Sequence, residues 1–441
     1  MTVVYFFIVT IALLAYLTRK ESLYLLCVFG MMTRLFMLDT SIEDNLLISG
    51  SDLAIILFIV LLPIAYNRDR RVFSINGDPL TKWVYVFILF YWIELFFTVA
   101  SGRDSFFNSI KVIRVSFVAF AFFTFKTISI DSFKKFLRIA FWITLIQGFL
   151  YLLQFAGIRI LSGANDSQAL SLGVASNTAI NTPTLLAFYI VFLWKANFLK
   201  SKRGFVFLFF ISLLFLSFVR GRIVAVLLGL AYLALTYSER SKRIPIILAF
   251  LLIIPIASRV IDAKSELSSG RGLEDIVYVF RSREDFTQVD KTNGTFSFRV
   301  AMLTERVVWL VDHPQYLLTG VGTMHEDSPQ SLRMFHFSIG TQNEARTYGH
   351  TLIESGDITW VPITLRYGAV GLLVHIMMFV VIFNAARKRK DVLVVLAAYF
   401  IIVFAESFDG SFFERSDYLL QMILFFAMIS RANYEDRPML I

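Results

Sequence analysis

The chain has 441 residues, of which 57% are hydrophobic, and a formal net charge of +9. Soluble domains are only about 45–50% apolar, so this composition excludes an ordinary soluble globular protein. The positive charge does not indicate a nucleic-acid partner, because it is concentrated in short turns between apolar runs. The single cysteine, Cys27, excludes an internal disulfide, and we expect it to be a buried structural thiol.

Apolar runs of about 15–22 residues recur along almost the whole chain, as membrane-spanning helices require. They predict an all-α, polytopic integral membrane protein with about 12–13 transmembrane helices. The first run lacks a basic leader and a small-residue cleavage site, so we expect a retained helix and not a signal peptide. The predicted spans lie near residues 3–17, 22–38, 52–66, 81–100, 106–125, 136–157, 178–197, 204–219, 223–237, 244–261, 358–384, 392–406 and 417–430.

Lysine and arginine are distributed unequally between alternate turns. One set of turns, which includes those at Arg68, Lys126 and Arg387, holds 21 of these residues, and the other set holds 5. Basic turns stay in the cytoplasm, so we expect the first set and the C-terminus to face inward. The second set consists of Arg103, Arg159, Arg220, Arg222 and Arg415.

The same alternation divides the chain into three parts. Residues 1–261 are predicted to form an N-terminal bundle of transmembrane helices, and residues 358–441 to form the C-terminal transmembrane helices. Between them, residues 262–357 form a polar segment that is too long for a connector, so we expect one large external loop that folds on the membrane surface. Within it, the apolar spacing of Ser297–Val311 predicts a helix that ends at His313-Pro314.

Several ionisable residues fall inside predicted spans. Each would cost about 2.5–3.5 kcal/mol if it faced lipid, so they should face a cavity or a partner. Lys111 and Arg114 are three apart and should share one helix face. An alternative is that Lys111 reaches the membrane surface and Arg114 pairs with Glu94. The residues concerned are Arg34, Glu94, Lys111, Arg114 and Arg366.

A short hairpin carries two further arginines, in "SFVRGRIVAVLLGL". The helix before the turn, about Gly204–Val219, is roughly 24 Å long and falls short of the hydrocarbon core of about 30 Å. Arg220 and Arg222 should therefore lie below the membrane surface. Guanidinium groups bind phosphate oxygens in pairs, so this turn predicts a diphosphate site. The alternative is a turn whose arginines only reach lipid headgroups.

Three proton-exchanging residues, His350, Glu354 and Asp357, precede the span that begins near residue 358. Their i, i+4 and i+7 spacing places them on one face if the segment is helical. Such a group could take a proton from a hydroxyl. The alternative is that Asp357 caps the following helix, which Gly356 favours.

Three patterns between about Phe207 and Leu373 occur together. They are the short hairpin "LLFLSFVRGR", the loop helix "FRVAMLTERVVWLVDHPQYLLTGVG", and an outer-face polar residue, Asp357, which ten residues separate from Gly368 of "RYGAVG". In order, spacing and predicted sidedness they resemble the family of O-antigen polymerases and O-antigen ligases. The resemblance implies a GT-C-like glycosyltransferase that acts on the outer face of the bacterial plasma membrane. The chemistry fits without a metal or cofactor, because a diphosphate is already a good leaving group and the sequence has no H-E-x-x-H, no paired cysteines and no D-x-D on the outer face.

In this family the substrate is a glycan linked to undecaprenyl diphosphate, carried in the membrane lipid. The resemblance implies that Arg220 and Arg299 bind the diphosphate. Arg222, from its place in the recessed turn, and Arg114, from its place inside a span, are further candidates. It also implies a base that activates the acceptor hydroxyl. The ligases have a histidine ten residues before the glycine, whereas this chain has Asp357, which looks more like the polymerase branch.

We therefore expect a polymerase that moves the growing glycan of lipopolysaccharide or capsule onto the next lipid-linked repeat unit, with a chain-length regulator as a further partner. The alternatives are a ligase that moves the chain onto lipid A core, and a flippase for lipid-linked oligosaccharide. For the base, His350 could act with Asp357 or Glu354 orienting it. Asp357 could also act alone, or the trio could only cap a helix, with His325 and His336 next in line.

Overall fold

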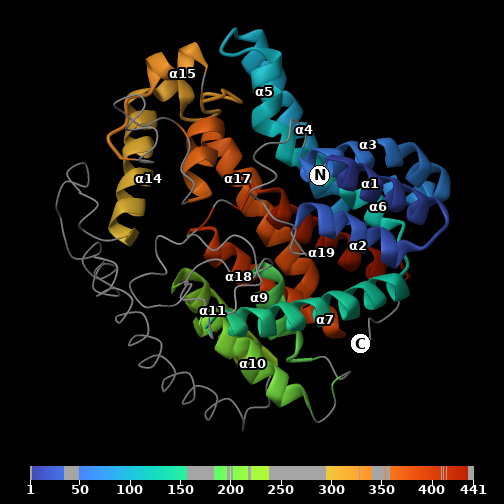
Figure 1. Cartoon of the computed structure of the whole chain (residues 1–441). Helices are drawn as coiled ribbons and strands as arrows, with labels where there is room; N and C mark the ends of the chain where they lie inside the picture. Colours follow the sequence, from blue (N-terminus) through green and yellow to red (C-terminus); the bar gives the residue numbers. More distant parts are fainter. Residues whose placement is uncertain are drawn as a thin grey trace.

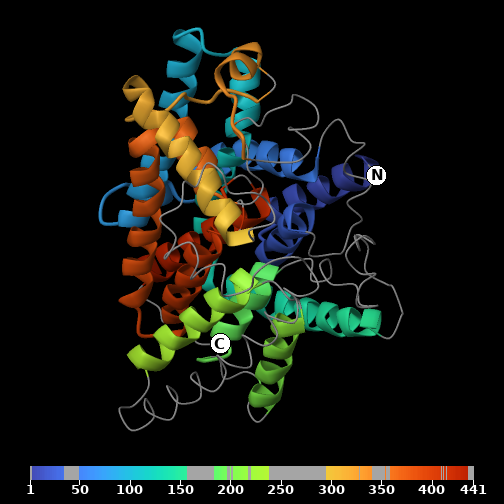
Figure 2. The ribbon, with the colours of Figure 1, turned by 90° about the vertical axis from the view of Figure 1, so that its left-hand side faces the viewer.

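The computed structural model describes residues 2–33, 49–155, 183–195, 199, 202–216, 220–237, 295–326, 328–339, 353, 358–408, 410, 412–413 and 415–435. These residues form a bundle of helices (Figures 1 and 2), and the described part of the chain contains no β-strand. The predicted all-α class is confirmed. Arg34 and the predicted span at 244–261 lie outside the described residues, as do His350, Glu354 and Asp357.

The helices follow the apolar runs closely. Described helices lie at twelve of the thirteen predicted spans, and the remaining one is the span at 244–261. The α-helices of the bundle are α1 (Thr2–Leu17), α2 (Glu21–Met32), α3 (Gly50–Arg68), α4 (Pro79–Ala100), α5 (Phe106–Ile113), α6 (Ala121–Lys126), α7 (Ile130–Phe155), α9 (Pro183–Phe192), α10 (Arg203–Leu216), α11 (Arg220–Tyr237), α17 (Trp360–Arg387), α18 (Val395–Glu406) and α19 (Ser416–Glu435). Short 3₁₀ segments are η2 (Arg70–Phe73), η3 (Arg114–Phe120), η7 (Pro314–Tyr316) and η8 (Val392–Val394).

Five of the described helices are long and apolar enough to cross a membrane, which suits a polytopic membrane protein. They cover Gly50–Arg68, Pro79–Ala100, Phe106–Lys126, Ile130–Leu153 and Trp360–Arg387. The third of these is not one uniform helix, because α5, η3 and α6 follow one another directly. The described helix α10 has 14 residues, about 21 Å.

Three of the basic turns of the first set, those near Arg19, Arg68 and Lys126, contact one another at one end of the bundle, which we call the basic end. There the Lys126 ammonium lies 2.7 Å from the Asp78 carboxylate, which also accepts a hydrogen bond from Ser430. Arg431 lies 3.5 Å from Asp69 in the turn between α3 and η2. The opposite end, where α4 ends and α5, α17 and α19 begin, is called the cavity end.

The described part of the predicted external segment folds at the cavity end. The predicted helix is α14 (Thr295–Asp312), and it ends directly before His313-Pro314, as expected. It lies beside α17, with the short α15 (Pro329–Met334) at its upper end (Figure 1). A small apolar core joins these elements, with Leu310, Val321, Met324, Phe335, Phe337, Ile353 and Leu365 buried together.

Candidate functional site

The glycines of "TGVG" lie directly against the start of α17. The amide of Gly322 donates a hydrogen bond to the carbonyl oxygen of Arg366 (2.7 Å), and the amide of Val321 donates to that of Leu365 (3.0 Å). Gly320 and Gly322 have φ angles of 64° and 85°, a left-handed conformation that favours glycine. These bonds fix the loop after α14 onto the first two turns of α17.

Gly368 interrupts α17 with φ 57° and ψ −152°. The interruption frees the amides of Ala369 and Val370 from their helical partners, and they donate instead to the carbonyls of Leu317 and Leu318, both at 3.0 Å. The glycine motifs at 320–322 and 368 therefore form one backbone unit, and Arg366 lies at its centre.

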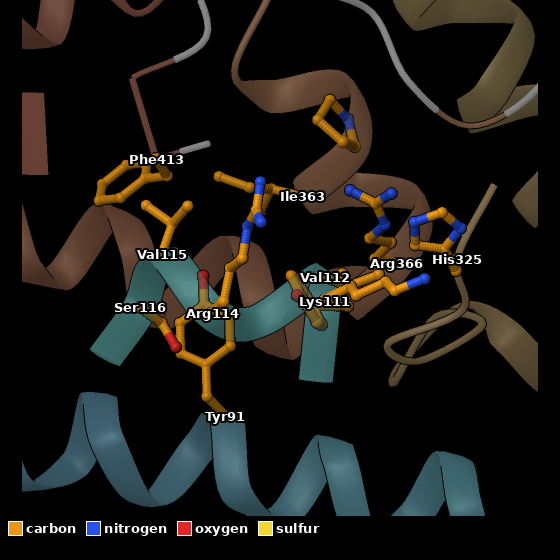
Figure 3. Close-up of a pocket in the computed structure, with 12 residues that line it drawn as sticks. Tyr91, Lys111, Val112, Arg114, Val115, Ser116, His325, Ile363, Arg366 and Phe413 are labelled. Carbon is orange, nitrogen blue, oxygen red and sulfur yellow. The ribbon is translucent and has the colours of Figure 1, made fainter. Parts of the chain in front are cut away.

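This unit forms one wall of a cavity of about 290 Å³ at the cavity end (Figure 3). The helix α4 contributes Tyr91, the α5–η3 segment contributes Lys111 and Arg114, α17 contributes Arg366, and the loop after α14 contributes His325. Figure 3 shows these side chains around the same space. No carboxylate is among the described residues that line it.

Three cations line this one cavity, an arrangement that can attract an anion. Arg366 is only 5% exposed, whereas the Arg114 side chain is 57% exposed. Lys111 is exposed and forms no ion pair among the described residues. Guanidinium forks and an ammonium group together match the oxygens of a phosphate or diphosphate, and the apolar walls strengthen the attraction. The prediction that Lys111 and Arg114 share a face is confirmed.

The alternative that Arg114 pairs with Glu94 is wrong. Arg114 lies 3.8 Å from the Asp52 carboxylate near the start of α3, whereas Glu94 is buried within α4 at 4% exposure. That two spans are neighbours in the sequence does not determine which faces of their helices contact each other. In addition, the 3₁₀ winding that begins at Arg114 advances about 120° per residue instead of 100°, which shifts the faces of this segment.

A second cavity of about 350 Å³ adjoins the first, and Arg114 and Val115 line both. Its lining differs in charge, because it includes Asp52 and Asp417 as well as Arg415. Asp417 is held by Arg415 at 2.8 Å. Arg114 therefore lies between a space lined by cations and a space lined by both signs of charge.

Arg222 and Arg299, both predicted to bind the diphosphate, do not line the cationic cavity. Arg222 lies 2.9 Å from Glu406 at the end of α18, and the two side chains are 15% and 5% exposed. Its charge is thus neutralised within the bundle. Arg299 is half-buried on the first turns of α14, and Arg220 begins α11, but the Arg220 side chain lies outside what the structure describes.

The predicted base cannot be placed, because His350, Glu354 and Asp357 fall outside the described residues. Of the two histidines next in line, His325 lines the cationic cavity, and its amide donates to Asp104 at 2.8 Å. His336 is exposed and is not among the lining residues.

Sequence reasoning missed Asp52 and Tyr91, because Asp52 resembles a helix cap and Tyr91 resembles an ordinary aromatic residue of an apolar span.

Among the described residues, no group of three or more His, Cys, Asp or Glu side chains could hold a metal ion. No protein-family model matches the chain, and no curated protein matches it. The candidate site therefore rests on the geometry of the cationic cavity, formed by residues of α4, α5, η3 and α17 and of the loop after α14.

Proposed function

We propose that this chain polymerises lipid-linked oligosaccharide repeat units and that the cationic cavity binds the diphosphate of the undecaprenyl carrier. One observation carries the proposal: Lys111, Arg114 and Arg366, three cations that the sequence places inside spans, line one cavity. Charges at such depth are expensive unless they serve a ligand or a partner. The likeness of the hairpin, loop-helix and glycine motifs to the O-antigen polymerase family supports the same substrate class.

The chemistry needs charge neutralisation and positioning. The acceptor hydroxyl attacks the anomeric carbon, the bond from that carbon to the diphosphate oxygen breaks, and the diphosphate leaves with the electron pair. Cations already in place stabilise that leaving group without reorganisation. The hydroxyl proton passes to a base, for which His325 is the described candidate in the cavity and His350 and Asp357 are the candidates from the sequence.

The proposed orientation places the cavity end on the outer face of the bacterial plasma membrane. The 21-to-5 asymmetry of lysine and arginine supports it, because basic turns stay in the cytoplasm. Contacts at the basic end join several of these turns, through Asp78, Lys126 and Arg431. An outward cavity would meet glycans that have already crossed the membrane.

The glycan made by a strain that lacks this chain separates the proposal from its alternatives. A polymerase leaves a single repeat unit on the lipid carrier or the lipid A core. A ligase leaves long chains on the carrier, and a flippase leaves lipid-linked units on the cytoplasmic face. Long chains in the deletion strain would contradict the proposal, provided that the wild-type gene restores the normal length distribution.

A further inference from the structure

The second cavity carries a balanced set of charges, unlike the cationic cavity beside it. Arg114 and Arg415 line it together with Asp52 and Asp417, so two cations face two carboxylates. The described lining of the cationic cavity holds three cations and no carboxylate. An anion is therefore attracted to the first space, whereas the carboxylates of the second repel it. The second cavity suits an uncharged ligand that is rich in hydrogen-bonding groups.

The lining of the second cavity also disfavours a hydrocarbon chain. Most of its lining residues have polar side chains, and three of them are serines, whose hydroxyls both donate and accept. The hydroxyls of Ser51 in α3 and Ser416 in α19 lie 2.8 Å apart, so this wall joins two helices. A polyprenyl tail would cover these polar groups with hydrocarbon, which costs free energy. Sugar hydroxyls also donate and accept, so they match this lining.

Asp52 is the carboxylate that can accept a hydrogen bond from such a ligand. Its Oδ2 accepts from the amide (3.2 Å) and the hydroxyl (2.8 Å) of Ser49, which orients the side chain at the start of α3. Its Oδ1 lies 3.8 Å from the Arg114 guanidinium, beyond hydrogen-bond distance, and the side chain is 29% exposed. In Asp417, by contrast, both oxygens accept from Arg415, at 3.1 and 2.8 Å.

Arg114 joins the two spaces as a glycosyl diphosphate requires. It lines both cavities, and its side chain is well exposed. In a glycosyl diphosphate the anionic group is bonded directly to an uncharged sugar. A ligand whose diphosphate contacts Arg114 in the cationic cavity can therefore place that sugar in the second cavity, beside Asp52. The charges of the two linings match the two halves of the ligand.

We propose that the second cavity binds the sugar that is linked to the diphosphate, and that Asp52 accepts a hydrogen bond from one of its hydroxyls. This inference rests on the proposed function, because it takes the ligand of the cationic cavity to be a glycosyl diphosphate. It adds a site for the sugar to the site for the leaving group.

The test compares the binding of two lipids to the purified protein in detergent: undecaprenyl diphosphate, and the undecaprenyl-diphosphate-linked repeat unit extracted from the host. We expect Asp52→Asn to weaken binding of the glycosylated lipid by about three- to tenfold, as the loss of charge from one hydrogen bond predicts. Binding of undecaprenyl diphosphate should not weaken, because the variant removes a negative charge near Arg114. The double variant Ser51→Ala/Ser416→Ala should show the same selectivity with a smaller loss.

Asp69→Asn is the matched control, because Asp69 also caps the start of a helical segment and lies near an arginine, but at the basic end. Retained binding of undecaprenyl diphosphate shows that each variant is folded. If Asp52→Asn binds the glycosylated lipid as tightly as wild type, the inference is overturned and the proposed function stands. An equal loss for both lipids would also overturn it, because Asp52 would then act on the diphosphate site or on the fold alone. Failure of the wild-type protein to bind either lipid would contradict the proposed function itself.

Discussion

Gly320 and Gly368 approach each other so closely that a side chain on Gly368 would place its Cβ 2.7 Å from the Gly320 amide nitrogen. A Cβ on Gly320 would lie 2.3 Å from the carbonyl carbon of Arg366. These contacts join the loop after α14 to α17 and form the wall of the cavity that carries Arg366. The glycines of the two motifs thus allow the close backbone packing that holds Arg366 at the cavity.

Alanine at Gly320 or Gly368 should therefore lower the free energy of unfolding by more than backbone strain alone. Strain at a positive φ costs about 1–3 kcal/mol, and the clash with backbone atoms adds to it. Two controls separate the backbone strain from the clash. Gly102→Ala has the strain (φ 68°) but open space around the new side chain, and Gly204→Ala has open space and an ordinary φ. Thermal unfolding in detergent measures all four variants. A Gly368→Ala protein as stable as Gly102→Ala would contradict the close approach.

The Asp78 carboxylate is predicted to stabilise the basic end in a pH-dependent manner. Burial raises its pKa, but the Lys126 ammonium and the hydrogen bonds from Ser430 and Thr81 outweigh that effect and hold the pKa below its ordinary value of 3.8. A depressed carboxylate pKa stabilises the fold above the ordinary value, and the contribution disappears as the pH falls through the lowered pKa.

Asp78→Asn should thus destabilise the protein at neutral pH by on the order of 3 kcal/mol, because it leaves the buried Lys126 without its counter-ion. The difference in unfolding temperature between Asp78→Asn and wild type should shrink as the pH falls below about 4. Unfolding temperatures at several pH values measure it. Asp131→Asn is the control, since that carboxylate pairs with Lys134 but is 85% exposed. If the unfolding temperatures of Asp78→Asn and wild type differ by the same amount at every pH, the Asp78 carboxylate does not stabilise the basic end in this way.

Arg222 is expected to act as half of an ion pair with Glu406 and not as a phosphate ligand. Arg222→Ala leaves a buried carboxylate, so it should lower the unfolding temperature, and the double variant Arg222→Ala/Glu406→Ala should recover part of the loss. Affinity for undecaprenyl diphosphate should change little. If Arg222→Ala unfolds like wild type and loses that affinity, the arginine binds the ligand, as the sequence predicted.

The sequence predicts the local features of this protein well, because they depend on short-range patterns. Apolar runs predict the helices, and the spacing in Ser297–Val311 predicts α14 and its end at His313. The glycine of "RYGAVG" also coincides with an interruption of α17, since only a residue without a Cβ adopts φ 57° easily.

The site itself depends on contacts that no short pattern encodes. Arg222 and Glu406 are 184 residues apart, and Arg114 meets Asp52 through the packing of η3 on α3. His375 lies in an apolar run and resembles a core residue until the Tyr91 hydroxyl is found beside it, 284 residues away in the chain. Which ionisable residues share a cavity follows from helix rotation, which periodicity leaves open when a helix is apolar on every side.

The proposed orientation predicts which end of the bundle faces outward. Cysteine can be placed at Ser101, exposed at the cavity end, and at Asn76, exposed near the basic end, after Cys27 has been replaced by serine. In intact cells a membrane-impermeant maleimide should label the Ser101→Cys protein and spare the Asn76→Cys protein, which should react only after lysis. The reverse pattern would contradict an outward-facing cavity.

The most direct test of the central claim is the affinity of purified protein for undecaprenyl diphosphate when the cations of the cavity are removed. Lys111 and Arg114 are exposed, so alanine at either position should leave the fold intact. We expect each variant to bind about ten- to a hundredfold more weakly, as the loss of a charge-assisted hydrogen bond predicts, and Arg114→Lys to restore only part of the affinity. Lys134→Ala, which removes a cation outside the cavity that pairs with the exposed Asp131, is the control. Wild-type affinity in the Lys111→Ala/Arg114→Ala double variant would contradict the account.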